Sequence, residues 1–390
     1  MICDTFDEPE MIRMMRDSIR RFASATLSAE SMRVMDKANI YDPAVFAKLG
    51  EMGVCGLTVE EKYGGLGCDI PAAIAVIEEL SRFAGPMAGP YIHCAFYGGI
   101  NISEKGTPEQ KKMLLPKLAA GEVMFAYGLS EPDIGADLAN VKTTADLSKD
   151  GDVVIINGSK RWCTMAQQAD YIYCLVRSDR DAPKYQNLSF VLIPKGTPGV
   201  TIEEIPHAGL YYAPTYDVTF EEVRVPATNI VGGMDAWNRG WPLLAGPALD
   251  VEKLEVAALA YGTALACVDI AWQYAKERKQ FGKPIAQHQA VGHALAEAQT
   301  NLLACRQVLY YAADLAQQGK PCSAETSMAK LFVTEQCEKI GMECQKVLGA
   351  YGFADEYDLE RYIPMLHLMT VIGGSSAIQR NNISKRLGLV

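Results

Sequence analysis

The hydrophobic positions of the chain change their periodicity twice, and each change marks a new kind of secondary structure. In the first 120 residues apolar side chains recur every three or four positions, the period of an amphipathic helix. The earliest series is Ile12, Met15, Ile19 and Phe22, and further helices are predicted over Pro43–Met52, Ile70–Phe83 and Thr107–Leu118. The first part of the chain is therefore predicted to be helical.

After Gly121 short runs of β-branched and aromatic residues replace the helical period. Turn residues such as Asn157-Gly158 separate these runs. The predicted strands are Val153–Ile156, Tyr171–Val176, Leu188–Ile193, Val200–Ile205 and Val218–Val225. Short strands at this spacing indicate a small antiparallel barrel or sandwich.

Beyond Gly233 long stretches rich in Ala, Leu and Glu predict a bundle of long helices over Pro247–Lys279, Gln287–Gln318 and Ser323–Leu348. We therefore predict an α+β fold with an N-terminal helical domain (1–121), a middle β-domain (122–233) and a C-terminal four-helix bundle (234–390). Strands do not alternate with helices and no G-x-G-x-x-G motif is present, which argues against a Rossmann-type dinucleotide site.

Composition narrows the possible partners and the compartment. Lys and Arg number 37 and Asp and Glu 47, and this net charge of −10 argues against nucleic acid or an anionic membrane as the main partner. The 11 cysteines include no C-x-x-C pair, which favours reduced, mostly buried thiols. The apolar run Val256–Val268 is too short to span a bilayer and is expected in a core helix. The acidic first residues resemble neither a secretory signal nor a transit peptide, so we expect a cytoplasmic protein.

Four segments, in a fixed order, resemble the acyl-CoA dehydrogenase family of flavoproteins. They are Tyr127–Asp137, Asn157–Thr164, Arg278–Ile285 followed by Gln289, and Val347–Phe353 with the tail Gly373–Arg380. Each is a weak pattern alone, but four at compatible spacing are specific, and the resemblance extends over nearly the whole chain. It implies an acyl-CoA substrate and FAD as the cofactor.

A flavin ring needs hydrogen-bond donors along one edge and an apolar surface against one face. Hydroxyl or amide groups at Leu129, Ser130 and Thr164 and the indole of Trp162 can supply both, although the residues alone also fit an indole packed in the β-domain core. The guanidinium of Arg278 can neutralise the cofactor pyrophosphate, and a solvated arginine is the alternative. The resemblance implies cofactor contacts from Tyr127, Leu129, Ser130, Trp162, Thr164, Arg278, Phe281, Gln289, Lys346, Gly349 and Ser375.

The resemblance also implies partners. In the family, the arginine equivalent to Arg278 reaches the cofactor of a neighbouring subunit, so a homotetramer, or at least a dimer, is expected to complete each site. Electron-transfer flavoprotein is the electron acceptor that the resemblance implies.

Oxidation of an acyl-CoA needs a buried carboxylate, because the α carbon of a thioester is too weak an acid for an ordinary solvated base. Most family members carry this glutamate in the C-terminal tail, where this sequence has Gly373. In the isovaleryl-CoA and long-chain branches it lies near the start of the first bundle helix, and counting back from Gly262 identifies Glu252 as the predicted base. Glu255, three residues on, is the competing candidate. Apart from the resemblance, Glu252 is typical of an acid that favours the helix dipole.

Further positions are implicated in substrate binding by the resemblance, namely Tyr91, Ala136, Lys253 and Gly373. Further positions depart from the family pattern: Ala136 replaces a serine, Lys253 replaces the arginine beside CoA, Lys346 replaces a glutamine, and Pro364-Met365 replaces an Arg-Asp pair. His93 lies in a segment that borders the acyl pocket in the family, with packing in the core as the alternative. The five histidines form no metal-binding pair, so no metal site is assigned.

Together these residues predict an enzyme that removes an α proton from an acyl-CoA and passes a β hydride to flavin N5, giving the α,β-unsaturated thioester. A base on the bundle helix favours a branched, cyclic or otherwise bulky acyl group, because it reshapes the floor of the pocket. Two alternatives remain. One is an enoyl-CoA reductase of the same fold, which Tyr261–Ala264 also resembles, and the other is a non-catalytic acyl-CoA-binding subunit, which the missing tail glutamate motivates.

Overall fold

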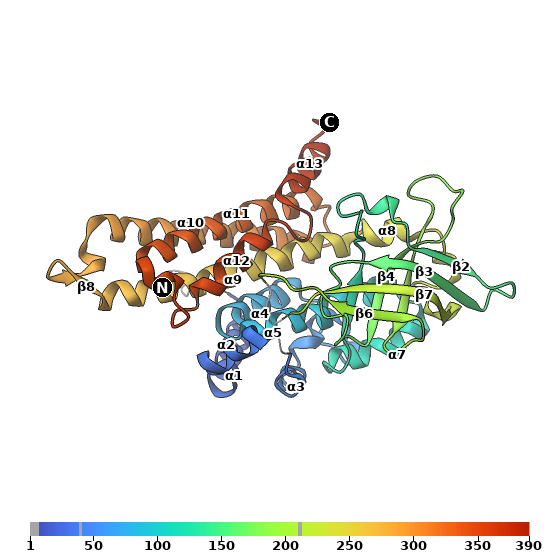
Figure 1. Ribbon diagram of the computed structural model, residues 1–390, viewed down its shortest axis with the longest axis horizontal. Helices are drawn as coiled ribbons and strands as arrows, with labels where there is room; N and C mark the ends of the chain where they lie inside the picture. Colours follow the sequence, from blue (N-terminus) through green and yellow to red (C-terminus); the bar gives the residue numbers. More distant parts are fainter. Residues whose placement is uncertain (1–7, 39–40, 210–212, 390) are drawn as a thin grey trace.

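The structure is a computed structural model, and it describes residues 8–38, 41–209 and 213–389 of the 390-residue chain. Helices, strands and long helices follow one another in the predicted order, so the expected fold class is confirmed. Figure 1 shows the long C-terminal helices along one side of the molecule, the N-terminal helices packed against them, and the β-sheet at one end. The domain boundaries at residues 121 and 233 stay a prediction.

The N-terminal part is a group of helices whose apolar faces share one core. They are α1 (Glu10–Thr26), α2 (Ala29–Ala38), α3 (Pro43–Glu51), α4 (Ile70–Phe83), α5 (Gly85–Tyr91), α6 (Asn101–Lys105) and α7 (Pro108–Ala119). The predicted apolar stripe of α1 is confirmed, because Ile12, Ile19 and Phe22 are buried. Between α5 and α6 the chain forms a π-helix, Ile92–Ile100, a geometry that apolar spacing does not indicate.

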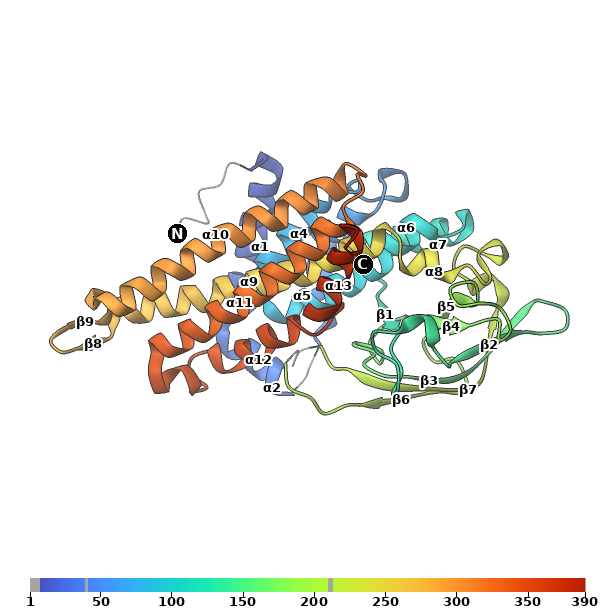
Figure 2. The same ribbon diagram turned by 90° about the horizontal axis from the view of Figure 1, so that it is seen from above.

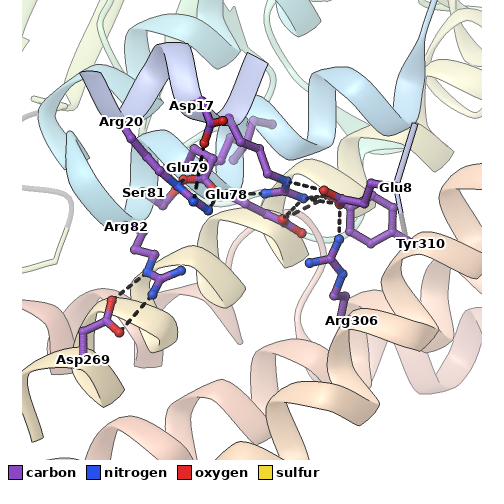
Figure 3. Close-up of polar contacts among 12 residues, drawn as sticks. Glu8, Asp17, Arg20, Glu78, Glu79, Ser81, Arg82, Asp269, Arg306 and Tyr310 are labelled. Atoms are coloured by element: carbon purple, nitrogen blue, oxygen red, sulfur yellow. Dashed lines mark hydrogen bonds and ion pairs between the residues drawn. The ribbon is translucent and has the colours of Figure 1, made fainter. Parts of the chain in front are cut away.

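A cluster of buried charges joins α1 and α4 to α10 (Gln289–Gln317) of the C-terminal bundle (Figure 3). The Arg16 guanidinium lies 2.8 Å from Glu78 Oε2 and 3.0 Å from Glu79 Oε1. The Tyr310 hydroxyl donates to Glu78 Oε2 over 3.1 Å. Buried charges are tolerated only when they are paired, so this cluster ties the N-terminal helices to the bundle.

The middle part contains a sheet that has seven strands in the described part of the chain. They are β1 (Phe125–Gly128), β2 (Thr144–Leu147), β3 (Val153–Lys160), β4 (Tyr171–Arg177), β5 (Leu188–Pro194), β6 (Val200–Glu204) and β7 (Tyr216–Pro226). The strand order is β1-β4-β2-β3-β7-β6, and β5 pairs with β4. Side chains alternate along β4: Tyr173 and Leu175 join the core shared with the helices, while Ile172 and Cys174 join a second core inside the β-domain.

The five predicted strands are confirmed as β3 to β7, and the structure adds two. β1 and β2 have four residues each, too few for an alternating pattern to be recognised. The predicted antiparallel pairing holds for β2–β3, β3–β7, β4–β5 and β6–β7, but β4 pairs in parallel with β1 and β2. The chain forms the β2–β3 hairpin between β1 and β4. It then returns to the edge of β1, so that β4 runs in the same direction as β1.

The C-terminal part is a bundle of long helices, and the three predicted long helices are confirmed as α9, α10 and α11. Its elements are α8 (Gly240–Leu244), α9 (Pro247–Glu277), the hairpin of β8 (Lys279–Gln280) and β9 (Lys283–Pro284), α10, α11 (Ser323–Leu348), α12 (Leu359–Met369) and α13 (Ser376–Arg386). Figures 1 and 2 both place the β8–β9 hairpin at the end of the bundle that lies away from the sheet.

Helix α9 runs through the centre of the core. Among the described residues, the stretch Gly240–Glu277 is long and apolar enough to cross a membrane, but 89% of its most apolar window is buried inside the protein. It is therefore the core helix that the apolar run predicts. Gly262 permits close packing of α9 on α4, because a Cβ there would lie 2.3 Å from the Glu78 carbonyl oxygen. Cys267, like the other described cysteines, is a free thiol, as expected for a reduced protein.

Candidate active site

One pocket receives residues from all three parts of the chain. Its sheet-side part is bounded by β4 and β5, and its helix-side part is bounded by the π-helix. Both parts are lined by Asn101, Tyr127, Ala248 and Glu252. The two parts therefore form one continuous site around the start of α9.

Glu252 lies on α9 five residues after its first residue, Pro247, and faces both parts of the pocket. Burial raises the pKa of Glu252 from 4.5 to about 7, and the nearby charge of Lys253 opposes this rise. The side chain stays partly exposed, because it faces the open space of the pocket. A carboxylate with a pKa near neutrality is suited to accept and return a proton.

Glu255 is the more deeply buried of the two carboxylates. The residue is 1% exposed, and neither carboxyl oxygen has a hydrogen bond of normal geometry. Burial raises the pKa of Glu255 well above its usual value, the charge of Glu252 adds to the rise, and the Tyr97 hydroxyl opposes it. Because Glu255 is enclosed more fully than Glu252, burial disfavours its charged form more strongly, and Glu252 is the first of the pair to ionise.

Aromatic rings form much of the pocket wall. Tyr97 and Tyr127 stack with ring centroids 3.7 Å apart and planes 12° apart. The Asn101 amide donates to the Tyr127 hydroxyl over 2.5 Å and to the Tyr97 carbonyl over 3.0 Å, which fixes both residues. Burial, with the charge of Glu252, raises the pKa of Tyr127, so its phenol stays neutral.

The loop after β1 brings predicted flavin contacts next to the pocket. Leu129 lines the pocket together with Glu252. The buried Lys160 ammonium donates to the Leu129 carbonyl over 3.0 Å and to Glu131 Oε1 over 2.9 Å, and the Ser130 carbonyl accepts from a backbone N–H of the segment after β3. β3 therefore holds this loop in place through a buried charge pair.

Trp162 follows β3 directly, and the structure contradicts the alternative that it is an ordinary core residue. Its indole is 53% exposed, and its backbone has φ +64°, a left-handed conformation that is unfavourable for a large side chain. Thr164 is half-buried beside it, with its hydroxyl 3.4 Å from Thr215 Oγ1. An exposed flat ring next to a hydroxyl group is the kind of surface that a flavin requires.

The hairpin end of the bundle carries five predicted cofactor contacts, namely Arg278, Phe281, Gln289, Lys346 and Gly349. Arg278 ends α9 with its guanidinium 5.7 Å from the ring centre of Tyr351, and Phe281 is 94% exposed. Lys346 is exposed and pairs with Glu343 over 2.6 Å. Because this end lies away from the sheet (Figure 2), one protomer does not bring these residues to Trp162.

The tail residue Gly373 lies against α9. Its φ is +59°, and a Cβ there would lie 2.9 Å from Val256 Cγ2. The buried Lys330 ammonium donates to the Gly374 carbonyl over 2.8 Å, and the Gln379 amide donates to the carbonyls of both glycines. The tail thus reaches the helix of Glu252 without contributing a carboxylate at this position.

Tyr91 and His93 lie behind the pocket. The Tyr91 ring is fully buried and its hydroxyl donates to the Val54 carbonyl over 3.3 Å, so the predicted substrate contact is wrong. A His93 ring nitrogen lies 2.8 Å from the Phe125 carbonyl oxygen, and burial lowers the pKa of His93 to about 4. The packing alternative therefore holds for His93, and Tyr91 belongs to the same core layer.

The predicted contact between Lys253 and CoA is also wrong. The residue is 2% exposed, and its ammonium donates to Asp250 Oδ1 over 2.8 Å and to Thr326 Oγ1 on α11. A buried ammonium that is already paired cannot reach a solvent-facing phosphate. Ala136 is exposed in the loop after β1, and Ser375 caps α13 by accepting from a backbone N–H, so both remain predicted contacts.

Tyr97, Asn101, Tyr173 and Phe190 are among the residues of the pocket wall that were not predicted as site residues from the sequence. Tyr97 is in the π-helix and Asn101 begins α6 directly after it, and that helical geometry shifts side chains away from the ordinary 3.6-residue spacing. Tyr173 and Phe190 are indicated only as apolar strand residues, and which face of the sheet meets the helices depends on the tertiary fold.

Comparison with known families matches this fold and site. The acyl-CoA dehydrogenase N-terminal domain matches residues 9–122, the middle domain residues 126–223 and the C-terminal domain residues 238–388. The chain therefore belongs to the acyl-CoA dehydrogenase family, as the sequence segments predict, and it is an enzyme of that family.

Two curated relatives cover almost the whole chain. An acyl-CoA dehydrogenase of Bacillus subtilis is 33% identical over 377 residues, which are 96% of this chain and 97% of the relative. The caffeyl-CoA reductase–Etf complex subunit CarC of Acetobacterium woodii is 32% identical over 382 residues, 97% of this chain and 98% of the relative. The relatives thus include both dehydrogenases and reductases.

Solved structures have the same fold. The butyryl-CoA dehydrogenase of Megasphaera elsdenii has a TM-score of 0.92 and 28% identity, covering 98% of this chain and 99% of that structure. PigA, solved with FAD and proline, has a TM-score of 0.90 and 26% identity, covering 98% and 99%.

Proposed function

We propose that this chain oxidises a branched, cyclic or otherwise bulky acyl-CoA to its α,β-unsaturated thioester, with Glu252 as the base that removes the α proton. The observation that supports this best is the position of Glu252 in the pocket, where burial raises its pKa to about 7. Glu255 is the less suitable base, because it ionises only after Glu252 and is almost fully enclosed.

The surrounding residues give Glu252 its reactivity. The stacked rings of Tyr97 and Tyr127 exclude water, which keeps the carboxylate a stronger base than in solution. Asn101 fixes both rings through its amide. An acyl chain in this pocket lies between the aromatic wall and the first turns of α9, with its α carbon within reach of Glu252.

The cofactor is FAD, as in this family. When bound, FAD supplies the hydride acceptor for the β carbon. The chain fits such a group in two places. The exposed indole of Trp162 offers a flat surface beside the Leu129 loop, and the guanidinium of Arg278, over the Tyr351 ring at the hairpin end, offers a cation.

We further propose that a second copy completes each cofactor site, in a homotetramer. Arg278 and Phe281 lie at the hairpin end and Trp162 beside the sheet, so one protomer cannot bring them to the same cofactor. Phe281 is 94% exposed, as expected for an apolar ring that another subunit covers. Electron-transfer flavoprotein is the proposed electron acceptor and the cytoplasm the proposed location.

An anaerobic titration of the purified holoenzyme with a panel of straight, branched and cyclic acyl-CoAs tests this function. One thioester should bleach the visible flavin absorbance, Glu252→Gln should abolish bleaching, and Glu221→Gln, an exposed strand residue, should leave it unchanged. Retention of bleaching in Glu252→Gln would contradict the assignment of the base, and failure of every thioester to bleach the flavin would contradict the dehydrogenase function.

The reductase direction is a second candidate, because the chain is 32% identical to a caffeyl-CoA reductase complex subunit. In that direction Glu252 would deliver a proton, and a pKa near 7 suits either task. Reduced enzyme mixed with an enoyl-CoA distinguishes the two, since rapid return of the flavin absorbance favours reduction. The non-catalytic alternative is not retained, because the pocket contains a suitable carboxylate.

A further inference from the structure

The proposed reaction uses one carboxylate, yet the pocket contains a second. Glu255 is 1% exposed and lines the helix-side part of the pocket. Both of its carboxyl oxygens are buried without a hydrogen bond of normal geometry. The Tyr97 hydroxyl interacts with this carboxyl, but one hydroxyl does not satisfy all of its donor and acceptor positions. A buried polar group that is left partly unsatisfied destabilises the fold, so its presence beside a cavity points to a ligand that completes its hydrogen bonds.

The surroundings of Glu255 restrict the chemistry of that ligand. Among the described residues that line the two parts of the pocket, none is basic, and the nearest lysine, Lys253, is tied to Asp250. A ligand carboxylate would therefore meet two acidic groups without a cation. The Asn101 amide already donates to Tyr127 and Tyr97, and the Tyr97 hydroxyl acts on Glu255, so the remaining hydrogen-bonding positions of the Glu255 carboxyl are the ones open to a ligand group in this part.

The protonation state of Glu255 further restricts the chemistry of the ligand. Burial and the charge of Glu252 raise the pKa of Glu255, so its carboxyl is protonated when Glu252 is ionised. A protonated carboxyl has one O–H donor and a free acceptor oxygen. An alcohol has the same pair of functions, so one hydroxyl group can satisfy both.

The position of Glu255 sets where that hydroxyl lies. Residues three apart on a helix are neighbours on one face, with Cβ atoms roughly 5–6 Å apart. A group on Glu255 therefore lies several bonds from the carbon that Glu252 deprotonates, and the aromatic and apolar lining of this part of the pocket fits the acyl chain.

We propose that Glu255 is a specificity residue that hydrogen-bonds a hydroxyl group on the acyl chain, so the substrate is a hydroxylated acyl-CoA. This inference rests on the proposed function for its direction along the chain, and it names the substrate class of the same site. It explains why a carboxylate occupies a position of α9 where an apolar side chain would otherwise fill the pocket wall.

A matched set of thioesters tests the proposal: hexanoyl-CoA, ω-hydroxyhexanoyl-CoA, ω-aminohexanoyl-CoA and adipyl-CoA. Binding is measured by calorimetry on holoenzyme carrying Glu252→Gln, and kcat/KM is measured on the parent enzyme. We expect the hydroxylated thioester to bind roughly ten- to a hundredfold more tightly than hexanoyl-CoA, since the latter leaves the carboxyl unsatisfied. The dicarboxylic thioester should bind most weakly.

Variants of Glu255 identify the residue responsible. Glu255→Leu should remove the preference, because it weakens the binding of the hydroxylated thioester and strengthens the binding of hexanoyl-CoA. Glu255→Gln should keep most of the preference. Flavin content and the thermal midpoint report whether each variant is folded, and the comparison on the parent enzyme stands if Glu255→Leu does not fold.

Equal binding of hexanoyl-CoA and the hydroxylated thioester would overturn the proposal, as would equal losses for both in Glu255→Leu. Tightest binding of the aminated thioester would instead indicate an ionised Glu255 and a cationic substituent. If the hydroxylated thioester still binds more tightly but does not bleach the flavin, the proposed dehydrogenase function is contradicted and the proposed binding site is not.

Discussion

Raising the pH from 6 to 8 should increase the rate of flavin reduction by a bound acyl-CoA about ninefold, because Glu252 must be ionised to take the α proton. With a pKa of about 7, roughly one tenth of Glu252 is ionised at pH 6 and roughly nine tenths at pH 8. A carboxylate with the ordinary value of 4.5 would be almost fully ionised at both, and the rate would not change.

Rapid mixing of oxidised holoenzyme with saturating acyl-CoA, without oxygen, measures this rate at each pH. Glu252→Gln should lower it by roughly 10²–10⁴-fold at pH 8, the usual contribution of a general base. Glu255→Gln should leave the midpoint near pH 7, because the charge of Glu252 acts on Glu255 and Lys253 is the charged neighbour that affects Glu252. A rate that is constant between pH 6 and pH 8 would refute the raised pKa.

The same pKa makes a separate prediction about stability. Folding raises the pKa of Glu252 above 4.5, so its stabilising contribution is complete below about pH 4.5 and is lost as the pH rises through about 7. The gap corresponds to at most about 3 kcal/mol, and solvent around the partly exposed side chain reduces it to about 1–2 kcal/mol. Glu252→Gln should therefore unfold at higher urea than the parent at pH 8 and at the same urea near pH 4.5.

Three further changes probe other parts of the molecule. Arg16→Met should lower the free energy of unfolding by about 3–5 kcal/mol in urea titration, because it removes the guanidinium that pairs with buried Glu78, while Arg20 still pairs with Glu79. Lys142→Met, on an exposed pair, is the control and should leave the midpoint unchanged. Phe281→Ala should shift the assembly toward smaller species in light scattering and lower the ratio of flavin to protein, and an unchanged assembly would argue against a covered hairpin. Gly373→Glu in a Glu252→Gln background should not restore flavin reduction, because position 373 has φ +59° and no room for a Cβ; recovery of the parent rate would show that the tail can move.

Much of this architecture could be predicted from the sequence because its periodicities are long and regular. The helices of the bundle and strands β3 to β7 follow directly from them, whereas four-residue β1 and β2 and the π-helix Ile92–Ile100 leave no periodic signal. The polar and aromatic wall of the pocket depends on that π-helix and on which face of the sheet meets the helices. Tyr97, Asn101 and Tyr173 therefore become site residues only in the folded chain.

The role of a residue could be predicted where its place along the helix is sufficient. It could not be predicted where contacts in the folded chain determine the environment of the side chain. Glu252 faces the pocket as the count from Gly262 indicates. Lys253, the next residue, has the charge expected beside CoA but the wrong environment, since Asp250 and Thr326 bind its ammonium inside the bundle. One step along a helix turns a side chain by about 100°, which is enough to move it from the pocket to the interior.

The geometry also explains why the base lies on α9 when the tail residue at position 373 is a glycine. Gly373 packs on Val256, and Val256 is four residues after Glu252, so the two lie on the same face of α9 one turn apart. The tail position thus lies one turn from the base, but its φ of +59° and the lack of room for a Cβ leave α9 as the element that can carry the carboxylate here. Two carboxylates there, beside Glu255, would raise one another's pKa and leave the ionised base scarce at neutral pH. Retaining only Glu252, with glycine at 373, keeps one ionisable base in the pocket and frees Glu255 to bind the substrate.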